Sequence, residues 1–352
     1  MRDENNLTVA IAGATGAVGI ELLRCLERRN FPVKQLRLLA SERSKGRELE
    51  FRGEPVVVEE LAEECFRGVD IALFSAGGKI SREFVPKAVR QGALVIDNSS
   101  AFRMDPTVPL VIPEINPEAT LEHPGIIANP NCSTIIAITP LWPIHRVNPI
   151  RRLIAVTYQA ASGAGAAAMQ ELIDSTHSYL RNQKYQPKAL PHPYAFNLFN
   201  HDSAIDAENG YNEEEMKMVH ETWKIFGDPT MRISATCVRV PVLRAHSEAL
   251  VFECERPVMP NEVRQLLEGA PGIRIVDRVA EGYFPMPRDA SGQDEILVGR
   301  IRKDLSDPND RSIAMFVCGD QLLKGAALNA VQIAELMAAN ERKPAAQTAA
   351  RK

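Results

Sequence analysis

A glycine-rich turn between an apolar run and a helical pattern is the feature that most constrains the fold. Residues Leu7–Ala12 are apolar and predict a strand, and residues 17–29 have apolar residues at helical spacing. The turn between them is Gly-Ala-Thr-Gly-Ala-Val-Gly, with glycines at 13, 16 and 19. The free amides and the dipole of a helix that starts there can hold a pyrophosphate. The spacing is GxxGxxG rather than GxGxxG, so glycines that serve only a tight turn and close packing remain the alternative.

The same alternation of strand and helix continues through the first half of the chain. Short apolar runs predict strands at 35–40, 69–76 and 93–97, and residues 81–91 have a helical pattern. Strands that alternate with helices predict a parallel sheet with right-handed crossovers. We therefore expect a Rossmann-type α/β domain in this part of the chain.

The pattern changes at about residue 151. Strands become longer and alternate polar with apolar residues, as at 233–240 and 248–255, which predicts an antiparallel sheet in a second, α+β domain. Residues 182–212 are polar, contain prolines and lack periodicity, so an insertion, a lid and a subunit-contact loop all remain open. Residues 322–340 have apolar residues at helical spacing and predict one long amphipathic helix.

The overall composition excludes several classes of function. At 352 residues, with 45% of them hydrophobic, the chain is long enough for two domains with sizeable cores. Its 41 Lys and Arg against 45 Asp and Glu give a net charge of −4, which provides no basic surface for nucleic acid. The most apolar stretch, residues 135–144, is too short to cross a bilayer, and the polar residues 1–6 do not resemble a secretory signal. We expect a cytoplasmic protein that binds neither nucleic acid nor membrane.

One of the six cysteines differs from the rest. The closest pair, 237 and 254, is 17 residues apart, which excludes a CxxC metal site and a compact disulfide scaffold, and we expect no metal. Cys132 follows Asn-Pro-Asn at the predicted start of a helix that Asn131 or Ser133 can cap. The helix dipole and free amides favour a thiolate there, so Cys132 is a candidate nucleophile. An inert buried cysteine is the alternative, and we expect it for Cys25, Cys65, Cys237, Cys254 and Cys318.

A polar run follows the predicted strand at 35–40. In an NAD-binding domain an acidic residue at this point usually binds the ribose diol. Here Arg43 stands between Ser41 and Ser44, and a guanidinium with two hydroxyls can hold a 2′-phosphate. The run therefore favours NADP over NAD. Glu42 argues against this assignment, and a solvated polar turn is the alternative.

Small and polar residues also follow three other predicted strands. The run Ser-Ala-Gly-Gly at 75–78 lets a ligand approach the backbone closely. Arg103 follows a strand among hydroxyls and an amide and suits an oxyanion such as phosphate, unless it is a surface arginine. Gln159 ends another strand and precedes the small residues 160–165, so its side chain can face the chemistry. Packing glycines explain that last run almost as well.

The ordered set of motifs closely resembles bacterial aspartate-semialdehyde dehydrogenases over nearly the whole chain. Each motif alone is weak, but the order is highly specific. The matching motifs are the glycine turn from Gly13, Ser-Ala-Gly-Gly from Ser75, Asn-Ser-Ser-Ala-Phe-Arg ending at Arg103, Asn-Pro-Asn-Cys-Ser-Thr around Cys132, Gln159 with its Ser-Gly-Ala-Gly, Glu-Glu-Met-Lys from Glu214, Arg-Val-Pro-Val from Arg239, His-Ser-Glu from His246 and Lys-Gly-Ala-Ala from Lys324.

The resemblance implies an activity and its small-molecule partners. The activity is the reversible NADP-dependent interconversion of L-aspartate 4-semialdehyde and phosphate with L-4-aspartyl phosphate, through a cysteine thioester. A thiolate attacks the aldehyde, a hydride leaves for the nicotinamide, and phosphate cleaves the thioester. The pathways implied are the biosynthesis of lysine and diaminopimelate, threonine, methionine and isoleucine.

The resemblance also assigns roles to residues. Cys132 is the nucleophile, and Gln159 is a positioning group. His246 is the acid and base, a role that suits an imidazole of near-neutral pKa. Backbone amides near Cys132 are candidates to hold the oxyanion. The implied substrate contacts are Arg103 and Lys217 for phosphate, Arg239 for the α-carboxylate, Glu214 for the amino group, and Asn131. The implied cofactor contacts are Gly13, Thr15, Gly16, Ala17, Val18, Gly19, Ser41, Arg43, Ser44, Ser75, Ala76, Gly77, Ser162, Gly163 and Gln321.

Some of these assignments depend wholly on the resemblance. The residues alone do not distinguish His246 among seven histidines, and we expect the other six, His201 included, to be surface or packing residues. Glu214 and Lys217 are spaced i, i+3, so a surface ion pair is the alternative for them. The run Gly-Asp-Gln-Leu at 319–322 departs from the Asp-Asn-Leu expected in the family, which leaves the cofactor contact of Gln321 open.

The expected organisation is a nucleotide-binding domain and a catalytic domain. The nucleotide-binding domain comprises residues 1–131 plus 323–341, the catalytic and dimerisation domain residues 132–322, and a disordered tail residues 342–352. Family analogy predicts a homodimer.

Two rival functions remain. N-acetyl-glutamyl-phosphate reductase shares the chemistry, but its substrate nitrogen is acylated, and an acidic Glu214 argues against that. A cofactor-binding sensor without turnover would not need Cys132, His246, Arg103, Lys217 and Arg239 together.

Overall fold

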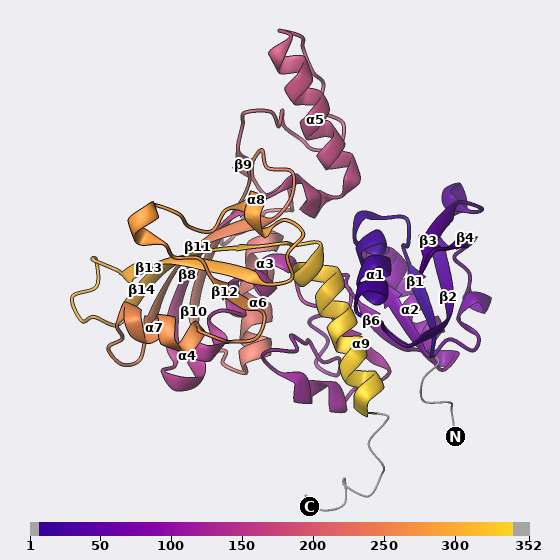
Figure 1. Cartoon of the computed structure of the whole chain (residues 1–352), viewed down its shortest axis with the longest axis horizontal. Helices are drawn as coiled ribbons and strands as arrows, with labels where there is room; N and C mark the ends of the chain where they lie inside the picture. The colour runs from indigo at the N-terminus through magenta and orange to yellow at the C-terminus, as the bar shows by residue number, and fades with distance from the viewer. Residues whose placement is uncertain (1–6, 341–352) are drawn as a thin grey trace, which may run out of the picture. The chain divides into compact units, whose positions relative to one another are not determined.

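The computed structural model describes residues 7–340, and the tail expected at 342–352 lies outside them. Contacts among the described residues define two compact units, 7–130 with 326–340 and 131–325. Each unit has its own seven-stranded sheet, and Figure 1 labels most of the elements of both.

The first unit is built on a mostly parallel sheet. Strand β1 lies near its centre, with β2 and β4 added on one side and β5, β6 and β7 on the other. The order therefore reverses between β1 and β5, the position at which doubly wound sheets bind their ligands. Its elements are β1 (Leu7–Ala12), β2 (Val33–Ala40), β3 (Glu48–Phe51), β4 (Glu54–Glu60), β5 (Ile71–Phe74), β6 (Leu94–Asp97) and β7 (Ile126–Ala128), with helices α1 (Ala17–Arg28), α2 (Gly78–Arg90) and α9 (Leu328–Asn340) and 3₁₀ turns at Glu42–Ser44, Glu63–Phe66 and Pro117–Leu121.

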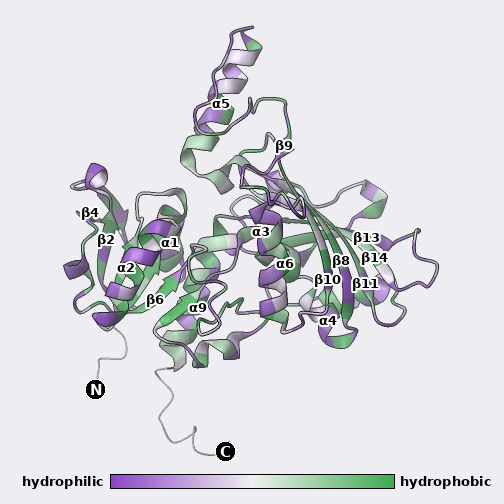
Figure 2. Cartoon of the chain, turned by 180° about the vertical axis from the view of Figure 1, so that it is seen from behind, coloured by the Kyte–Doolittle hydropathy of each residue, from purple (hydrophilic) through white to green (hydrophobic). Residues whose placement is uncertain are grey.

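Burial on both faces explains why these strands are continuous apolar runs. Every residue of β5 is buried, as are the last four of β1. Figure 2 shows β6 of the same sheet in the green of hydrophobic residues. The strand predicted at 69–76 is shorter, Ile71–Phe74, because the chain turns away at Ser75 and begins α2 at Gly78. The Rossmann-type α/β expectation for this unit is confirmed.

The last helix differs from its prediction at its start. The segment begins with a π-helical turn, Leu323–Ala327, and continues as α9 from Leu328. Ala330, Val331, Ile333 and Ala334 are fully buried on one face of α9. Gln332 and Glu335 are partly exposed on the opposite face, as expected of an amphipathic helix.

The second unit contains a mixed sheet rather than the antiparallel one expected. Strands β10 and β8 run parallel, as do β12 and β13, while the other neighbours are antiparallel. The long connection between β8 and β10, which includes α5 and α6, permits their parallel pairing. The elements are β8 (Ile150–Gln159), β9 (Phe199–Asn200), β10 (Arg232–Arg239), β11 (His246–Cys254), β12 (Ile273–Ile275), β13 (Ile296–Lys303) and β14 (Ser312–Gly319), with α3 (Cys132–Ile138), α4 (Trp142–Val147), α5 (Ala166–Leu180), α6 (Glu213–Phe226), α7 (Pro260–Leu267) and α8 (Pro287–Ala290) and 3₁₀ turns at Ala161–Ala164 and Val279–Glu281.

Strand ends in this sheet bring three candidate side chains together. Gln159 ends β8 and Arg239 ends β10, and the two residues are register partners. His246 begins β11, which pairs with β8 on its other side. The order β11-β8-β10 therefore places His246, Gln159 and Arg239 at one edge of the sheet.

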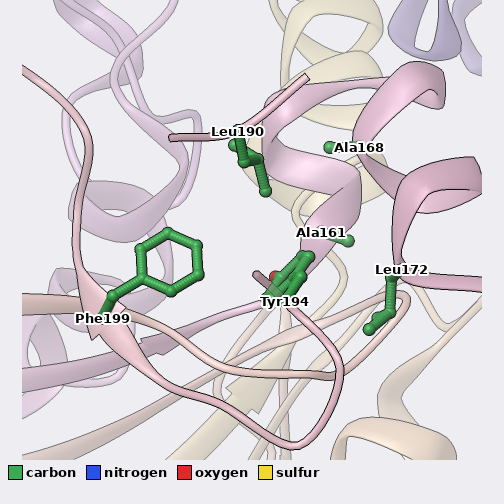
Figure 3. Packing of buried hydrophobic residues seen from close by; sticks show 6 residues of the cluster. All are labelled: Ala161, Ala168, Leu172, Leu190, Tyr194 and Phe199. Atoms are coloured by element: carbon green, nitrogen blue, oxygen red, sulfur yellow. The ribbon is translucent and has the colours of Figure 1, made fainter. Parts of the chain in front are cut away.

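The polar segment at 182–212 is packed against the rest of the unit. Its short strand β9 pairs antiparallel with the end of β10, with Phe199 opposite Arg239. The segment also contributes to a buried hydrophobic cluster with α5 and the turn before it (Figure 3). The cluster comprises Ala161, Ala168, Leu172, Leu190, Tyr194 and Phe199.

Candidate active site

Helix α3 begins at Cys132, and its start is fixed by the residue before it. Asn131 is the N-cap, and its Oδ1 accepts hydrogen bonds from the backbone N–H groups of Ser133 at 2.9 Å and Thr134 at 3.2 Å. Cys132 is half-buried, whereas the other five cysteines are buried. Among the backbone amides near Cys132, which we considered as oxyanion donors, those of Ser133 and Thr134 already donate to Asn131.

A glycine lets this helix start pack closely. A β-carbon on Gly325 would lie 2.9 Å from the Cys132 Cβ. No side chain fits there, which explains the glycine in the Lys-Gly-Ala-Ala motif. Lys324, beside it, is fully buried.

His246 faces the cysteine. Its Nε2 lies 3.5 Å from Cys132 Sγ, and its Nδ1 accepts a hydrogen bond from the Ala160 N–H at 3.0 Å. Burial, with the nearby charge of Arg239, lowers the pKa of His246 to about 3. The imidazole is therefore neutral at pH 7, and its hydrogen is on Nε2, next to the sulfur. The near-neutral pKa expected for it is wrong, because the side chain is completely enclosed.

A buried carboxylate connects Gln159 to the helix start. Glu214 Oε1 accepts from Asn131 Nδ2 at 2.9 Å and from Gln159 Nε2 at 3.2 Å, and its Oε2 lies 3.2 Å from Lys217 Nζ. Burial alone would raise the pKa of Glu214, but electrostatic interactions with His201 and Lys217 and the hydrogen bonds from Asn131 and Lys217 lower it to about 2. The Glu214 side chain is 6% exposed, so the surface ion pair considered above is wrong.

A second carboxylate of α6 was missed by the sequence reasoning. Glu221 is buried, and its Oε2 accepts from the backbone N–H of Asn131 at 2.6 Å. It lies seven residues after Glu214, on the same helix face, and that spacing is the signal that could have identified it.

Arg239 is buried at the end of β10, and a glycine lets its guanidinium and the His246 ring pack closely against the backbone. A β-carbon on Gly163 would lie 2.9 Å from His246 Cε1 and 3.4 Å from Arg239 Nη1. His201 and Asp202 contact the same guanidinium. His201, which we expected to be a surface or packing residue, thus contacts a buried arginine, and so does Asp202, which the sequence did not single out.

Two residues predicted to contact the cofactor bind each other. The Gln321 amide donates to Ser162 Oγ, and Gln321 Oε1 accepts from the Ala245 N–H at 2.9 Å. Both side chains are at most 2% exposed. These contacts hold the loop that precedes β11 and His246. Gln321, which belongs to the run that differs from the family sequence at 319–322, therefore has a structural role.

Arg103, in the first unit, is held in place by two carbonyl groups. Its Nε donates to Asn129 O at 2.9 Å and its Nη2 to Asn98 O at 2.7 Å. The residue is 7% exposed, so it is not a surface arginine.

The glycine turn of the first unit has the geometry of a dinucleotide site. A β-carbon on Gly13, whose φ is +88°, would lie 2.2 Å from Ser75 O, and one on Gly19 would lie 2.2 Å from Gly13 O. Close packing therefore requires glycine at both positions, in agreement with the alternative that these glycines serve a tight turn and close packing. Gly16 is the N-cap of α1, with no side chain capping the helix, so the helix start fits a pyrophosphate.

The polar run after β2 lies beside this turn. Thr15 Oγ1 and Ser44 Oγ are 3.2 Å apart, and Arg43 is exposed in the 3₁₀ turn Glu42–Ser44. The residues present therefore fit a nicotinamide dinucleotide.

Comparisons with known proteins agree with this geometry. Residues 8–123 match the family "Semialdehyde dehydrogenase, NAD binding domain", and residues 141–324 match "Semialdehyde dehydrogenase, dimerisation domain". An aspartate-semialdehyde dehydrogenase from Synechocystis sp. is 54% identical over 331 residues, which cover 94% of this chain and 97% of that protein. The chain belongs to the aspartate-semialdehyde dehydrogenase family.

Other aspartate-semialdehyde dehydrogenases extend the match. The protein from Aquifex aeolicus is 50% identical over 94% of this chain and 97% of its own. The crystal structure of aspartate semialdehyde dehydrogenase II from Vibrio cholerae, complexed with ASA, has a TM-score of 0.92 and 45% identity, covering 95% of this chain and 99% of that one. The protein is thus an oxidoreductase of amino-acid biosynthesis with an NAD(P)-binding domain. Within residues 7–340 no helix is long and apolar enough to cross a membrane.

Proposed function

We propose that the enzyme converts L-4-aspartyl phosphate reversibly to L-aspartate 4-semialdehyde and phosphate, with NADP as cofactor and a thioester on Cys132. The observation that carries the proposal is the pair formed by Cys132 Sγ and His246 Nε2, 3.5 Å apart, at the start of α3. Gln159, Glu214 and Arg239 surround this pair in the same unit.

The first step joins the acyl group to the sulfur. The Cys132 thiolate attacks the acyl carbon of aspartyl phosphate, a C–S bond forms, and phosphate leaves with the electron pair of the C–O bond. The N–H at Nε2 of His246 lies next to the sulfur and donates a hydrogen bond to the thiolate. Arg103 and Lys217 are the residues that we assign to the phosphate.

The second step releases the aldehyde. The nicotinamide, when bound, supplies the hydride that reduces the thioester carbon. The oxygen of the resulting thiohemiacetal carries the negative charge, and the Nε2–H of His246 can donate to it. Collapse of this intermediate breaks the C–S bond and restores the thiolate. Reversal of the same steps gives the phosphorylating oxidation.

Two buried charges select the amino acid part of the substrate. Arg239 suits the α-carboxylate, and its Nη1 lies beside Gly163 and close to His246. The Glu214 pKa of about 2 keeps this carboxylate ionised, as binding of a free ammonium requires. An acylated nitrogen, as in N-acetyl-glutamyl phosphate, carries no charge for Glu214 to bind.

The cofactor preference is part of the proposal. Gly13, Gly16 and Gly19 with α1 would hold the pyrophosphate, and Ser41, Arg43 and Ser44 the 2′-phosphate of NADP. Thr15, Ala17 and Val18 in the same turn, and Ser75, Ala76 and Gly77 after β5, complete the assigned contacts of this unit, with Ser162, Gly163 and Gln321 assigned from the second unit.

Arg43→Ala should raise the KM for NADP by about 10-fold or more and change the KM for NAD less than twofold. The reason is that a charge-assisted hydrogen bond to the 2′-phosphate contributes about 1.5–3 kcal/mol. Initial rates with each cofactor measure this. Lys45→Ala is the matched control, since Lys45 is in the same region but pairs with Glu60 at 3.2 Å. Equal changes with both cofactors would contradict the assignment.

We further propose a cytoplasmic homodimer that serves the biosynthesis of lysine and diaminopimelate, threonine, methionine and isoleucine. The match of residues 141–324 to a dimerisation domain supports the dimer. No metal is assigned to the reaction.

The test of the proposed function is phosphate-dependent formation of NADPH. Purified protein is supplied with aspartate semialdehyde in one reaction and with N-acetylglutamate semialdehyde in another. We expect turnover of the first alone, with an absolute requirement for phosphate. Turnover of only the acylated substrate would identify the rival reductase, and no turnover of either would indicate a cofactor-binding sensor.

A further inference from the structure

One edge of the Arg239 guanidinium is occupied by an acidic residue. Nε and Nη2 of Arg239 both lie 3.1 Å from Asp202 Oδ1, and Nη2 also lies 2.9 Å from His201 Nε2. Nη1 is on the other side of the planar group, where a β-carbon on Gly163 would lie 3.4 Å away. The same absent β-carbon would be 2.9 Å from His246 Cε1. Asp202 therefore binds the edge of the guanidinium that carries Nε and Nη2, whereas Nη1 lies on the side of Gly163 and His246.

Strand β9 places Asp202 and His201 beside Arg239. Its residue Phe199 is the register partner of Arg239, and the two residues that contact the guanidinium follow directly after the strand. Packing fixes this part of the chain, because the Phe199 ring meets the buried Tyr194 ring edge-on at 5.5 Å. Figure 3 shows both rings among the side chains of α5 and the turn before it.

His201 extends the contact to the residue that we assign to the substrate amino group. Burial, with further contributions from Arg239, lowers the pKa of His201, so the ring is neutral. Nε2 of His201 lies 2.9 Å from Arg239 Nη2, and Nδ1 accepts from the Ser203 N–H at 3.2 Å and lies 3.1 Å from Ser203 Oγ. Ser203 Oγ in turn accepts from the backbone N–H of Glu214 at 3.2 Å. The segment thus contacts both substrate-recognition residues.

We propose that Asp202 is a positioning residue for Arg239, and that the segment at 182–212 thereby sets the preference for aldehydes with an α-carboxylate. The inference rests on the proposed assignment of Arg239 to that carboxylate. An arginine side chain has substantial rotamer entropy. Because the carboxylate holds Nε and Nη2, the side chain loses this entropy before the substrate binds rather than on binding. Nη1 then stays directed toward Gly163 and His246.

The ionisation state of Asp202 is consistent with this role. Burial alone would raise its pKa, but the charge of Arg239 and the hydrogen bonds around the carboxylate lower it below the usual range. Asp202 is therefore charged throughout the neutral pH range. The Asp202 side chain is 29% exposed, whereas the Arg239 side chain that it contacts is only 5% exposed.

Asp202→Asn tests the proposal, because it keeps the shape of the side chain and removes the charge. We expect the KM for aspartate semialdehyde to rise about 10-fold, kcat to change less than about threefold, and the KM values for phosphate and NADP to stay the same. With 3-aminopropanal, which has the amine and the aldehyde but no carboxylate, kcat/KM should be unchanged. A general loss of structure would lower kcat/KM for both aldehydes.

Asp206→Asn is the matched control from the same segment. Asp206 is exposed, and among residues 7–340 its side chain accepts only from its own turn, at 2.8 Å from the Glu208 N–H and 2.9 Å from Asn209 Nδ2. All kinetic constants of this variant should equal those of the wild type.

Arg239→Lys separates failure of this inference from failure of the proposed function. If Arg239→Lys impairs the use of aspartate semialdehyde while Asp202→Asn does not, the positioning role is wrong and the function stands. If Arg239→Lys has no effect, the carboxylate assignment itself is wrong. A lower KM in Asp202→Asn would show that Asp202 competes with the substrate, and this would also overturn the proposal.

Discussion

Replacing Cys132 by alanine should lower kcat for phosphate-dependent oxidation of aspartate semialdehyde by about 10⁴-fold or more. The reason is that no other group can carry the acyl chain between the reduction and phosphate steps. The fold should persist, because alanine favours a helix and the Asn131 cap does not depend on the sulfur. Stopped-flow and steady-state absorbance of NADPH measure the loss.

Cys254→Ala is the control for this variant. Cys254 ends β11, the strand that begins with His246, and burial raises the pKa of its thiol to about 12. It is therefore not a thiolate at neutral pH and should be replaceable with kcat within about twofold, at a cost in stability of roughly 1 kcal/mol. A Cys132→Ala variant as active as this control would contradict the mechanism.

Glu248→Gln should make the enzyme more stable than the wild type, by an amount that grows with pH. Glu248 is fully buried on β11, and neither of its carboxyl oxygens has a hydrogen-bond partner among residues 7–340. Burial, with the charge of Glu214, raises its pKa well above the usual value. The folded protein therefore keeps this carboxyl protonated at pH values where the unfolded chain has released the proton.

The sign of the effect follows from proton linkage. Above the unfolded pKa, the unfolded state binds fewer protons at this site, so the free energy of unfolding falls by about 1.4 kcal/mol per pH unit until the folded pKa is reached. Glutamine has no proton to release, so the free energy of unfolding of the Glu248→Gln variant lacks this dependence on pH. Between pH 5 and pH 7 the stability difference between variant and wild type should grow by about 1–3 kcal/mol.

Urea unfolding at fixed protein concentration measures this difference. Glu253→Gln, on the same strand, is the control, because Glu253 pairs at the surface with Arg232 at 3.2 Å and Arg311 at 3.3 Å. It should not reproduce the pH-dependent gain. Parallel stability curves for Glu248→Gln and the wild type would show that Glu248 is ionised in the folded protein.

The neighbours of Glu248 explain why its burial could not be predicted from the sequence. Its register partner on β8 is Thr157, whose own partner on β10 is Cys237. Together they form a buried row directly behind Gln159 and Arg239. A glutamate in an alternating strand is normally expected on the solvent face, and only the mixed sheet, covered on this side, places it inside.

The parts of the site that local sequence could predict are those at strand and helix ends. The glycine turn, the start of α3 at Cys132 and the end of β8 at Gln159 each combine a periodic pattern with a change to small or polar residues. These signals are local, because a strand end or a helix cap is specified by a few adjacent residues. Their ordered combination was enough to identify the family.

The parts that could not be predicted depend on contacts between distant segments. Asp202 follows a two-residue strand in a polar stretch, and only its pairing with β10 shows its role. Glu221 meets Asn131 across 90 positions of the chain. The burial that lowers the pKa of His246 likewise arises from packing rather than from neighbouring residues.

The most direct test of the account is the mass of the protein trapped during catalysis. Enzyme mixed with aspartyl phosphate in the absence of reduced cofactor is quenched in acid, digested and examined by mass spectrometry. The account predicts one aspartyl group on the peptide that contains Cys132, and removal of that group when NADPH is added before the quench. Turnover without any acyl group at Cys132, or with the group on another residue, would contradict it.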